Sequence, residues 1–342
     1  MAKPSPAPNS RGVSIVGADT LLGREVREVL SDRKTGTVIT AYASSGEGSF
    51  AEQEGEAVYL DALDASSLKG QSALIVAGSP DGAMKAYNLV KAADGRLPLI
   101  DCTSNLEMQP EARIVSPLLN PEESHPGWLF VIAHPAAAAL ALVLIRLARF
   151  KTVQKAVVNI FEPASERGKR GASELHQQIT ALLAFKALEK KIFDAQLGFN
   201  MLPQYGEKAP EKLLAIEQRI ERHTATLLSR YAAAAPPMPS LRLIQSPVFH
   251  GYGLSLWVAF DGEVTANEVG EALASAQIEV RGQDQEAPDN VAVASQSGLL
   301  AGDIRQDSNN RRAVWLWVVG DNLRLRADAA ADLITGLDPK SQ

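Results

Sequence analysis

The fold of this chain depends on one stretch, Phe130-Val131-Ile132-Ala133-His134-Pro135-Ala136-Ala137-Ala138-Ala139-Leu140. Apolar residues lead into His134-Pro135, and an alanine-rich helical run follows at once. Pro135 disfavours the α region for the residue before it, so the chain should stay extended through His134. Proline is also well placed in the first turn of a helix, where its missing N–H costs nothing. The stretch therefore predicts a strand-to-helix turn that aims free backbone N–H groups at one spot.

The bulk composition sets the class of protein. With 342 residues, 46% of them hydrophobic, the chain can bury a sizeable core and should form two domains. A formal net charge of −6 argues against nucleic-acid binding, and no apolar run is long enough to span a membrane. Residues 1–11 lack the apolar stretch of a signal peptide and are predicted to be a short disordered lead. These features predict a cytoplasmic protein.

The first half of the chain alternates strands with helices. Val13–Val16 is predicted to be a strand, and the Gly17–Gly23 turn leads from it into a helix. Strand, glycine turn and helix in that order are typical of a nucleotide-binding βαβ unit. The pattern continues with a helix around Gly82–Ala93 and with strands near Val38–Ala43, Val58–Leu60, Ala73–Ala77 and Leu97–Ile100. This alternation predicts an α/β fold with a mostly parallel sheet.

The second half has a different pattern, which predicts an α+β domain. A strand is expected at Val157–Phe161, followed by long helices at about Ser173–Ile192 and Pro210–Tyr231 and an Ala- and Pro-rich link, Ala232–Pro239. Leu241–Gln245 and the alternating apolar residues of Leu254–Phe260 are interpreted as paired strands with one buried face. A capping box at Thr265–Glu268 opens another helix. Val314–Val319 is predicted to be the last strand and Ala327–Leu337 a closing helix.

Several motifs, in this order and spacing, resemble the aspartate-semialdehyde dehydrogenase family. They are the Gly17–Gly23 turn, Ile100-Asp101, Pro117–Pro121, Phe199–Gln204, Pro247–Gly251 and Trp315–Arg324. The resemblance implies a Rossmann-like domain over 12–133, an α+β dimerisation and substrate domain over 134–322, and a C-terminal helix, 323–342, that packs on the first domain. It also implies a homodimer.

The resemblance fails where the family's chemistry should be. The family attacks its substrate with a cysteine thiolate at a helix start, because a thiolate is nucleophilic near neutral pH. Ala137 stands at that cysteine's position, and Tyr252 stands where the family has a histidine acid–base. A tyrosine, with a pKa of about 10, does a histidine's proton transfers poorly at pH 7. The expected catalytic residues are therefore absent.

The family's substrate-anion contacts are replaced as well. Gln245 and Glu107 stand at the positions of two family arginines, Glu162 stands at a glutamine, and a family lysine falls within one residue of Leu213. These replacements predict an acidic pocket that repels phosphate and aspartate-like anions. Glu107 and Glu162 are alternatively an acid–base pair for a new reaction, although solvated carboxylates are commoner.

The cofactor signals are weak. Gly17 and Gly23 remain from the family's three turn glycines, but Thr20 replaces the middle one, which lets the backbone approach the cofactor phosphates. No arginine follows Ala43–Gly46, so a ribose 2′-phosphate has no evident partner. Leu325–Asp328 also replaces the family's Lys-Gly-Ala-Ala segment. The sequence leaves the binding of NAD or NADP open without supporting it.

The cysteine and the histidines can each be interpreted as functional residues or as ordinary packed or surface residues. Cys102, the one cysteine, is either a displaced nucleophile or, much more often for such a residue, a small packed side chain. His134 is either a base or a capping and packing residue, and His250 is left open. We expect the other three histidines to be surface residues: His125, His176 and His223. With one cysteine and no histidines at ligand spacing, no metal site is predicted.

Two hypotheses of different classes follow. The first is a catalytically inactive homologue, closest to the usg-type paralogues, with a structural or regulatory role as a homodimer or in association with an active relative. The second is an oxidoreductase that acts on aspartate semialdehyde or a related aldehyde with NAD(P), in amino-acid biosynthesis. The alanine run at Ala136–Ala139 separates the two, because it is hard to reconcile with acyl-enzyme chemistry.

Overall fold

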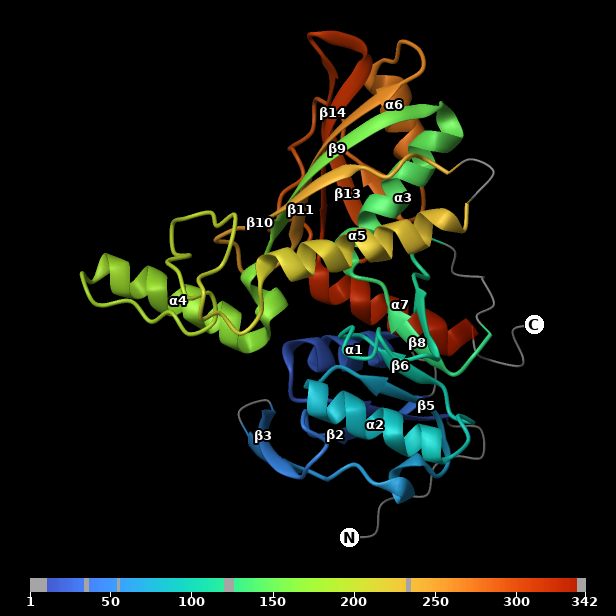
Figure 1. Cartoon of the computed structure of the whole chain (residues 1–342), viewed down its shortest axis with the longest axis vertical. Coiled ribbons are helices and arrows are strands. Elements are labelled where there is room, and N and C mark those ends of the chain that lie inside the picture. The colour runs from blue at the N-terminus through green and yellow to red at the C-terminus, as the bar shows by residue number, and fades with distance from the viewer. Residues whose placement is uncertain (1–10, 34–36, 54–55, 120–125, 232–234, 337–342) are drawn as a thin grey trace. The chain divides into compact units, whose positions relative to one another are not determined.

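The computed structural model of this chain describes residues 11–33, 37–53, 56–119, 126–231 and 235–336 (Figure 1). The chain divides into two compact units. The N-terminal unit holds Met1–Ala133 together with Arg326–Gln342, and the C-terminal unit holds His134–Leu325. Of the predicted lead, residues 1–10 lie outside the described residues, and Arg11 begins the first strand. No described helix is long and apolar enough to cross a membrane.

The N-terminal unit is built on a six-stranded parallel sheet, as the alternating pattern predicted. Its strands run in the order β2-β1-β5-β6-β8-β7. They are β1 (Arg11–Val16), β2 (Thr37–Tyr42), β5 (Gln71–Val76), β6 (Leu99–Asp101), β7 (Ala112–Val115) and β8 (Leu129–Ile132). Helices α1 (Leu21–Asp32) and α2 (Pro80–Ala92) pack against the sheet, whose central strands are almost wholly buried.

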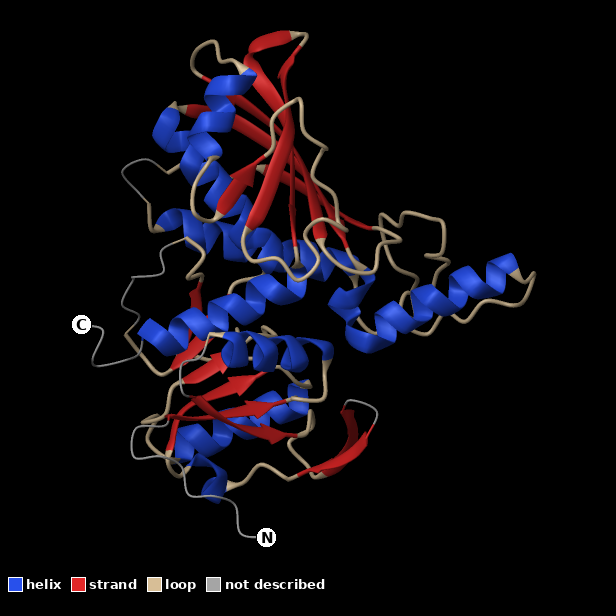
Figure 2. Cartoon of the chain, turned by 180° about the vertical axis from the view of Figure 1, so that it is seen from behind, coloured by secondary structure: helices blue, strands red, loops and turns tan. Residues whose placement is uncertain are grey.

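One predicted strand does not join this sheet. The apolar run at Val58–Leu60 lies in β4 (Glu56–Leu60), which pairs antiparallel with β3 (Ser49–Gln53) as a separate two-stranded sheet (Figure 2). Phe50 and Tyr59 face each other across it with ring centroids 5.2 Å apart. Such cross-strand aromatic pairs stabilise a hairpin locally. The short helix η1 (Ala65–Leu68) then returns the chain to β5.

The C-terminal unit contains a six-stranded mixed sheet in the order β10-β9-β11-β14-β13-β12. Its strands are β9 (Val153–Glu162), β10 (Ser240–Gln245), β11 (Tyr252–Phe260), β12 (Ile278–Val280), β13 (Leu299–Asp307) and β14 (Asn310–Gly320). The prediction that β10 pairs with β11 is wrong. Strand β9 lies between them, parallel to β10 and antiparallel to β11. Residues 246–251, which join β10 to β11, are longer than the two-residue turn of a tight hairpin, so the two strands can lie on either side of β9.

One face of the mixed sheet is covered by helices α3 (Pro135–Phe150), α5 (Leu213–Ser229) and α6 (Ala266–Leu273). Every residue of α3 from Pro135 to Ile145 is buried, which makes it the central helix of this unit. Its alanines suit that position, because small side chains let neighbouring backbones approach closely. Helix α6 begins at the predicted capping box, in which Thr265 and Glu268 bond to each other's backbone N–H.

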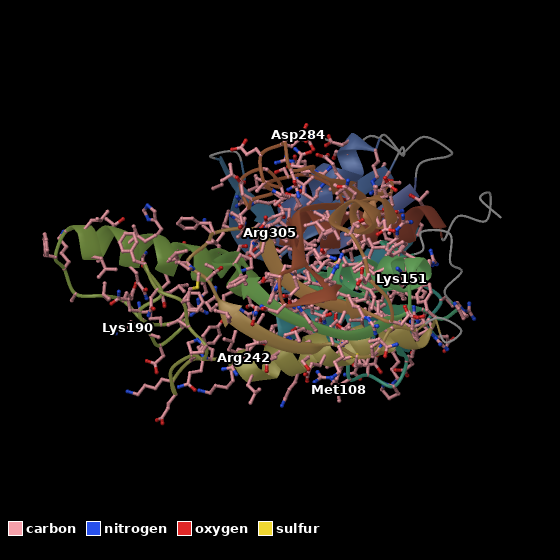
Figure 3. All side chains as sticks on the ribbon, turned by 90° about the horizontal axis from the view of Figure 1, so that it is seen from above. Met108, Lys151, Lys190, Arg242, Asp284 and Arg305 are labelled. Atoms are coloured by element: carbon pink, nitrogen blue, oxygen red, sulfur yellow. The ribbon has the colours of Figure 1, made fainter. Side chains whose placement is uncertain are left out.

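The first long helix of this unit is shorter than predicted. Helix α4 (Gly168–Leu183) ends nine residues before Ile192, and the next segment folds back along it. Glu174 accepts the backbone N–H groups of Lys191, Ile192 and Phe193 at 2.7, 2.7 and 3.2 Å. This buried carboxylate gives those N–H groups a partner that a continued helix would otherwise supply. Figure 3 shows Lys190 on this segment, away from Arg305 of the sheet.

The closing helix α7 (Asn322–Gly336) starts five residues before the predicted Ala327. The Asp321 carboxylate accepts the N–H groups of Leu323 and Arg324 at 2.8 and 3.0 Å, so it caps the helix. From Arg326 onward the helix belongs to the N-terminal unit, which confirms its predicted return to the first domain. There Arg33, after α1, pairs with Asp328 at 3.1 Å and with Asp332 at 2.5 Å.

Candidate functional site

The start of α3 is fixed by a histidine that the sequence analysis placed on the surface. His223 of α5 is fully buried, and its Nδ1 accepts the backbone N–H of His134 at 2.9 Å. That prediction is wrong because His223 lies on the helix face that packs against α3. The spacing of Ile216, Ile220, His223 and Leu227 carried the signal, since residues three and four apart share one face. An accepting Nδ1 carries no proton, so His223 is neutral here.

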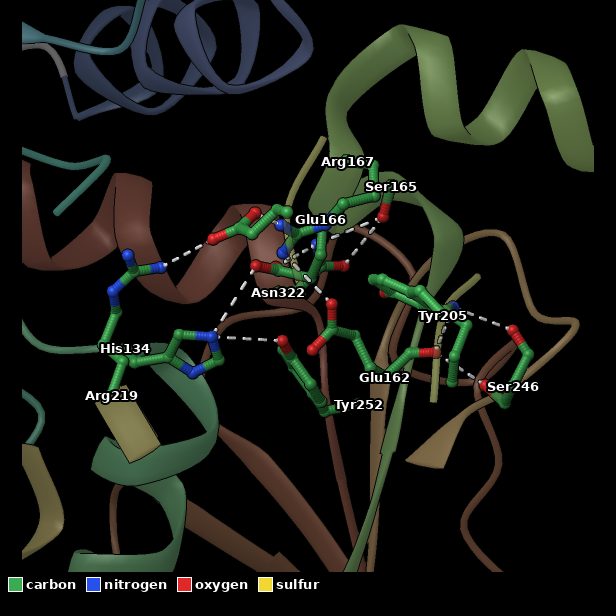
Figure 4. Close-up of polar contacts among 12 residues, drawn as sticks. His134, Glu162, Ser165, Glu166, Arg167, Tyr205, Arg219, Ser246, Tyr252 and Asn322 are labelled. Atoms are coloured by element: carbon green, nitrogen blue, oxygen red, sulfur yellow. Dashed lines mark hydrogen bonds and ion pairs between the residues drawn. The ribbon is translucent and has the colours of Figure 1, made fainter. Parts of the chain in front are cut away.

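The side chain of His134 packs against Tyr252 and Glu166 (Figure 4). Its Nε2 lies 3.3 Å from the Tyr252 hydroxyl and 3.9 Å from Glu166 Oε2. The three side chains are at most 2% exposed. His134 is the N-cap residue of α3 but makes no side-chain cap bond. The ring therefore packs inside a polar cluster rather than capping the helix, and Tyr252 is part of the same cluster.

Ala137 occupies the third position of α3 and is fully buried. This is the helix turn where backbone N–H groups and the positive helix end would activate a thiol. A methyl group there carries no lone pair and no ionisable proton. The geometry thus provides the environment of a nucleophile without the nucleophile.

Glu162 belongs to a chain of ion pairs, which changes the predicted charge of the site. It is fully buried, and its Oε1 lies 3.1 Å from Arg167 Nη2. Arg167 also pairs with Glu211, whose other oxygen lies 3.3 Å from Arg219 Nη1. Burial lowers the pKa of Arg167, but several nearby acidic groups, Glu162 first among them, together outweigh burial and raise the pKa overall. The expected solvated or uncompensated carboxylate at Glu162 is therefore wrong, because Arg167 neutralises it.

Gln245 uses both ends of its amide inside the protein. Its Oε1 accepts the Tyr205 hydroxyl at 2.5 Å, and its Nε2 donates to the Glu162 carbonyl at 2.8 Å. Burial, and after it the charge of Glu162, raises the pKa of Tyr205, which keeps that phenol a donor. Gln245 is fully buried, so this arrangement holds β10 against β9.

Asn322, the first residue of α7, links the cluster to two loops. Its Nδ2 donates to Glu166 Oε1 at 2.7 Å, and its Oδ1 accepts the backbone N–H of Gly251 at 3.0 Å. We use the name polar cluster for the residues His134, Glu162, Glu166, Arg167, Tyr205, Tyr252 and Asn322, which Figure 4 labels, together with Gln245. Sequence reasoning missed Glu166 and Arg167, although two adjacent charges four and five residues after the end of β9 were a signal.

The sequence also pointed to Leu213, as the approximate position of a family lysine. Leu213 begins α5 and is buried. Lys212, one residue earlier, donates its Nζ to the Gly206 carbonyl at 3.0 Å. Of the remaining histidines, His176 is exposed as expected, His250 is partly buried, and His125 lies outside the described residues.

The N-terminal unit holds the other predicted positions. Cys102 is 1% exposed, and burial raises the pKa of its thiol, so its interpretation as a packed residue is confirmed. Burial likewise raises the pKa of Asp101, whose carboxylate accepts the N–H groups of Thr103 and Leu106. Glu107, in the loop after β6, is partly buried. Among the described residues, no group of three or more His, Cys, Asp or Glu side chains is placed to hold a metal ion.

Comparison with known proteins identifies the family. Residues 144–325 match the semialdehyde dehydrogenase dimerisation domain. This chain belongs to the semialdehyde dehydrogenase family. Aspartate-semialdehyde dehydrogenase of Rickettsia bellii is 26% identical and covers 91% of this chain and 93% of the relative. The Synechocystis protein of the same name is 25% identical and covers 93% and 94%.

Solved structures agree on the fold. A probable aspartate-semialdehyde dehydrogenase from Pseudomonas aeruginosa superposes with a TM-score of 0.80 at 26% identity and covers 96% of this chain and 98% of that one. The second enzyme of this name from Vibrio cholerae gives a TM-score of 0.78 at 22% identity over 96% and 97%. The semialdehyde dehydrogenase fold, a parallel-sheet Rossmann-like domain joined to a mixed-sheet dimerisation domain, is thus confirmed for this chain.

Proposed function

We propose that this chain is an inactive member of the semialdehyde dehydrogenase family, of the usg type, that has kept the fold and the dimer but not the chemistry. The observation that carries the proposal is Ala137, buried in the first turn of α3 where a catalytic thiol would be activated. Cys102 does not replace it, because that thiol is buried and its pKa is raised.

The polar cluster supports the proposal independently. An acid–base residue needs a proton-accepting group within reach of a substrate. Here the Tyr252 hydroxyl lies beside the His134 ring. The Gln245 side-chain amide is hydrogen-bonded to Tyr205 and to the backbone of β9. Glu162 lies against Arg167. These groups bond to one another and to nearby backbone in a buried network, which helps to specify one packing of the unit.

The rival function is an oxidoreductase that acts on aspartate semialdehyde or a related aldehyde with NAD(P), in amino-acid biosynthesis. It rests on the names of the relatives and on the coverage of more than nine tenths of both chains. It requires a nucleophile or a hydride-transfer route that does not pass through Ala137.

A steady-state assay separates the two functions. Aspartate semialdehyde, phosphate and either NAD or NADP should give no turnover, because losing a covalent nucleophile costs many powers of ten. A turnover above about 0.1 per second, within a hundredfold of a median enzyme, would contradict the proposal.

We further propose a homodimer formed through the face of the mixed sheet opposite α3, α5 and α6. Register places Trp257 opposite Trp315 and next to Val157, while Ser255 faces Trp317. Val157 and Trp315 are 42% and 41% exposed, whereas the alternate residues of β11 are buried under the helices. A large apolar patch of this kind indicates a protein contact. The match to the family's dimerisation domain makes a second copy the partner, and an active relative would present the same kind of face.

Replacing Trp315 by aspartate should dissociate this dimer. A charge at the centre of an apolar interface has no partner and weakens association by at least about 2 kcal/mol, roughly thirtyfold in Kd. Met108→Asp is the matched control, since Met108 is 82% exposed and lies outside this sheet. Sedimentation at micromolar concentration should show a dimer for the wild type and the control and a monomer for Trp315→Asp. A wild-type monomer at every concentration would contradict the proposal.

A further inference from the structure

The turn between β1 and α1 is where the fold of the N-terminal unit places a dinucleotide's phosphates, because free N–H groups and the positive helix end favour an anion there. In this chain Thr20 occupies that position as the N-cap of α1. Its hydroxyl accepts the N–H of Gly23 at 2.9 Å and lies 2.8 Å from the Ala77 carbonyl oxygen. A donor that a phosphate would use is thus already bonded within the protein.

The glycines that remain in the turn are explained by packing alone. Gly17 has φ +90°, and a Cβ there would lie 2.4 Å from the backbone of Gly78. A Cβ on Gly23 would lie 2.0 Å from the Gly17 carbonyl oxygen. Both positions therefore need glycine so that β1, α1 and the end of β5 can meet. Their presence is no evidence that a cofactor binds.

Charge adds to the same effect. Asp19 precedes Thr20 in the turn, and its Oδ1 is buried without a hydrogen-bond partner among the described residues. A carboxylate at this point repels a pyrophosphate that approaches the helix end. Across the loop after β2, Lys85 is paired with Glu47 at 2.5 Å and bonded to the Gly46 carbonyl at 3.0 Å. The residues of this turn therefore do not fit a dinucleotide.

We infer that Asp19 and Thr20 close the α1 terminus against NAD and NADP, so that the N-terminal unit folds without a nucleotide. The inference is independent of the missing thiol, because an inactive homologue with an open turn would still bind the cofactor. Two adjacent side chains then account for the loss of nucleotide binding, so replacing both of them should restore it.

Calorimetric titration of the full chain with NAD and with NADP tests the inference. The wild type should bind neither with a Kd below about 1 mM. The double variant Asp19→Asn, Thr20→Gly should bind at least one of them at least about tenfold more tightly, because it frees a helix N–H and removes a charge. Glycine is tolerated at an N-cap, so the variant should fold.

The matched control is Thr265→Gly, which removes a threonine N-cap from α6 in the other unit. It should bind nucleotide no better than the wild type. A wild-type Kd below about 1 mM would overturn the inference. So would a double variant that melts cooperatively and yet binds no more tightly than the wild type. Either result would leave the proposed inactivity standing, because that rests on turnover and on Ala137.

Discussion

The variant Arg167→Met should lose about 3–5 kcal/mol of unfolding free energy in the C-terminal unit. Arg167 is the partner of Glu162, which is fully buried, and its own side chain is 12% exposed. Removing the guanidinium leaves a carboxylate in the protein interior without its compensating charge. Such a charge costs far more than the loss of a surface ion pair, because water does not replace the partner.

Denaturant titration followed by tryptophan fluorescence measures this loss, since Trp257, Trp315 and Trp317 all lie in the C-terminal unit. Lys191→Met is the matched control. Lys191 pairs with Glu189, but its side chain is 71% exposed, so the control should lose less than about 1 kcal/mol. Adding Glu162→Gln to Arg167→Met should recover at least half of the loss. Equal losses for Arg167→Met and Lys191→Met would show that the polar cluster does not support the fold.

Local sequence signals were enough to predict the scaffold of both units. The parallel sheet followed from apolar runs that alternate with helical segments, because its central strands β1, β5, β6 and β8 are almost wholly buried on both faces. Strand β13 was missed since Gly302, Asp303 and Arg305 interrupt its apolar run. Strand β13 forms by pairing with β14, and the residues of β13 alone do not predict that pairing.

Residues of the candidate site could be predicted from the sequence only where flanking motifs fixed their positions. Ala137 and Tyr252 were found because motifs on either side fixed their places in the chain. The predicted acidic pocket failed at Glu162, because Arg167 lies five residues on and its role depends on how η2 (Ala164–Arg167) turns it back. His223 lies 89 residues after His134 in the chain, so the sequence alone could not show that the two residues are in contact.

The second large effect concerns covalent chemistry at the start of α3. In the direction opposite to the assay above, the family's thiolate attacks the acyl carbon of aspartyl phosphate, a thioester forms and phosphate leaves. This half-reaction needs no nucleotide, so a closed α1 turn does not affect it. It does need an accessible thiolate, and burial raises the pKa of the chain's one thiol, Cys102. We therefore expect acylation to be slower by many powers of ten than in an enzyme with a cysteine at this turn.

Intact-mass spectrometry of the wild type after incubation with aspartyl phosphate is the most direct test of the proposed inactivity. The Ala137→Cys variant is the matched comparison, because it places a thiol in the same turn and changes nothing else. We expect the wild type to keep its unmodified mass and to release phosphate no faster than a protein-free blank. An acyl adduct on the wild type that maps to Cys102, or to any residue from His134 to Ala137, would contradict the proposed inactivity.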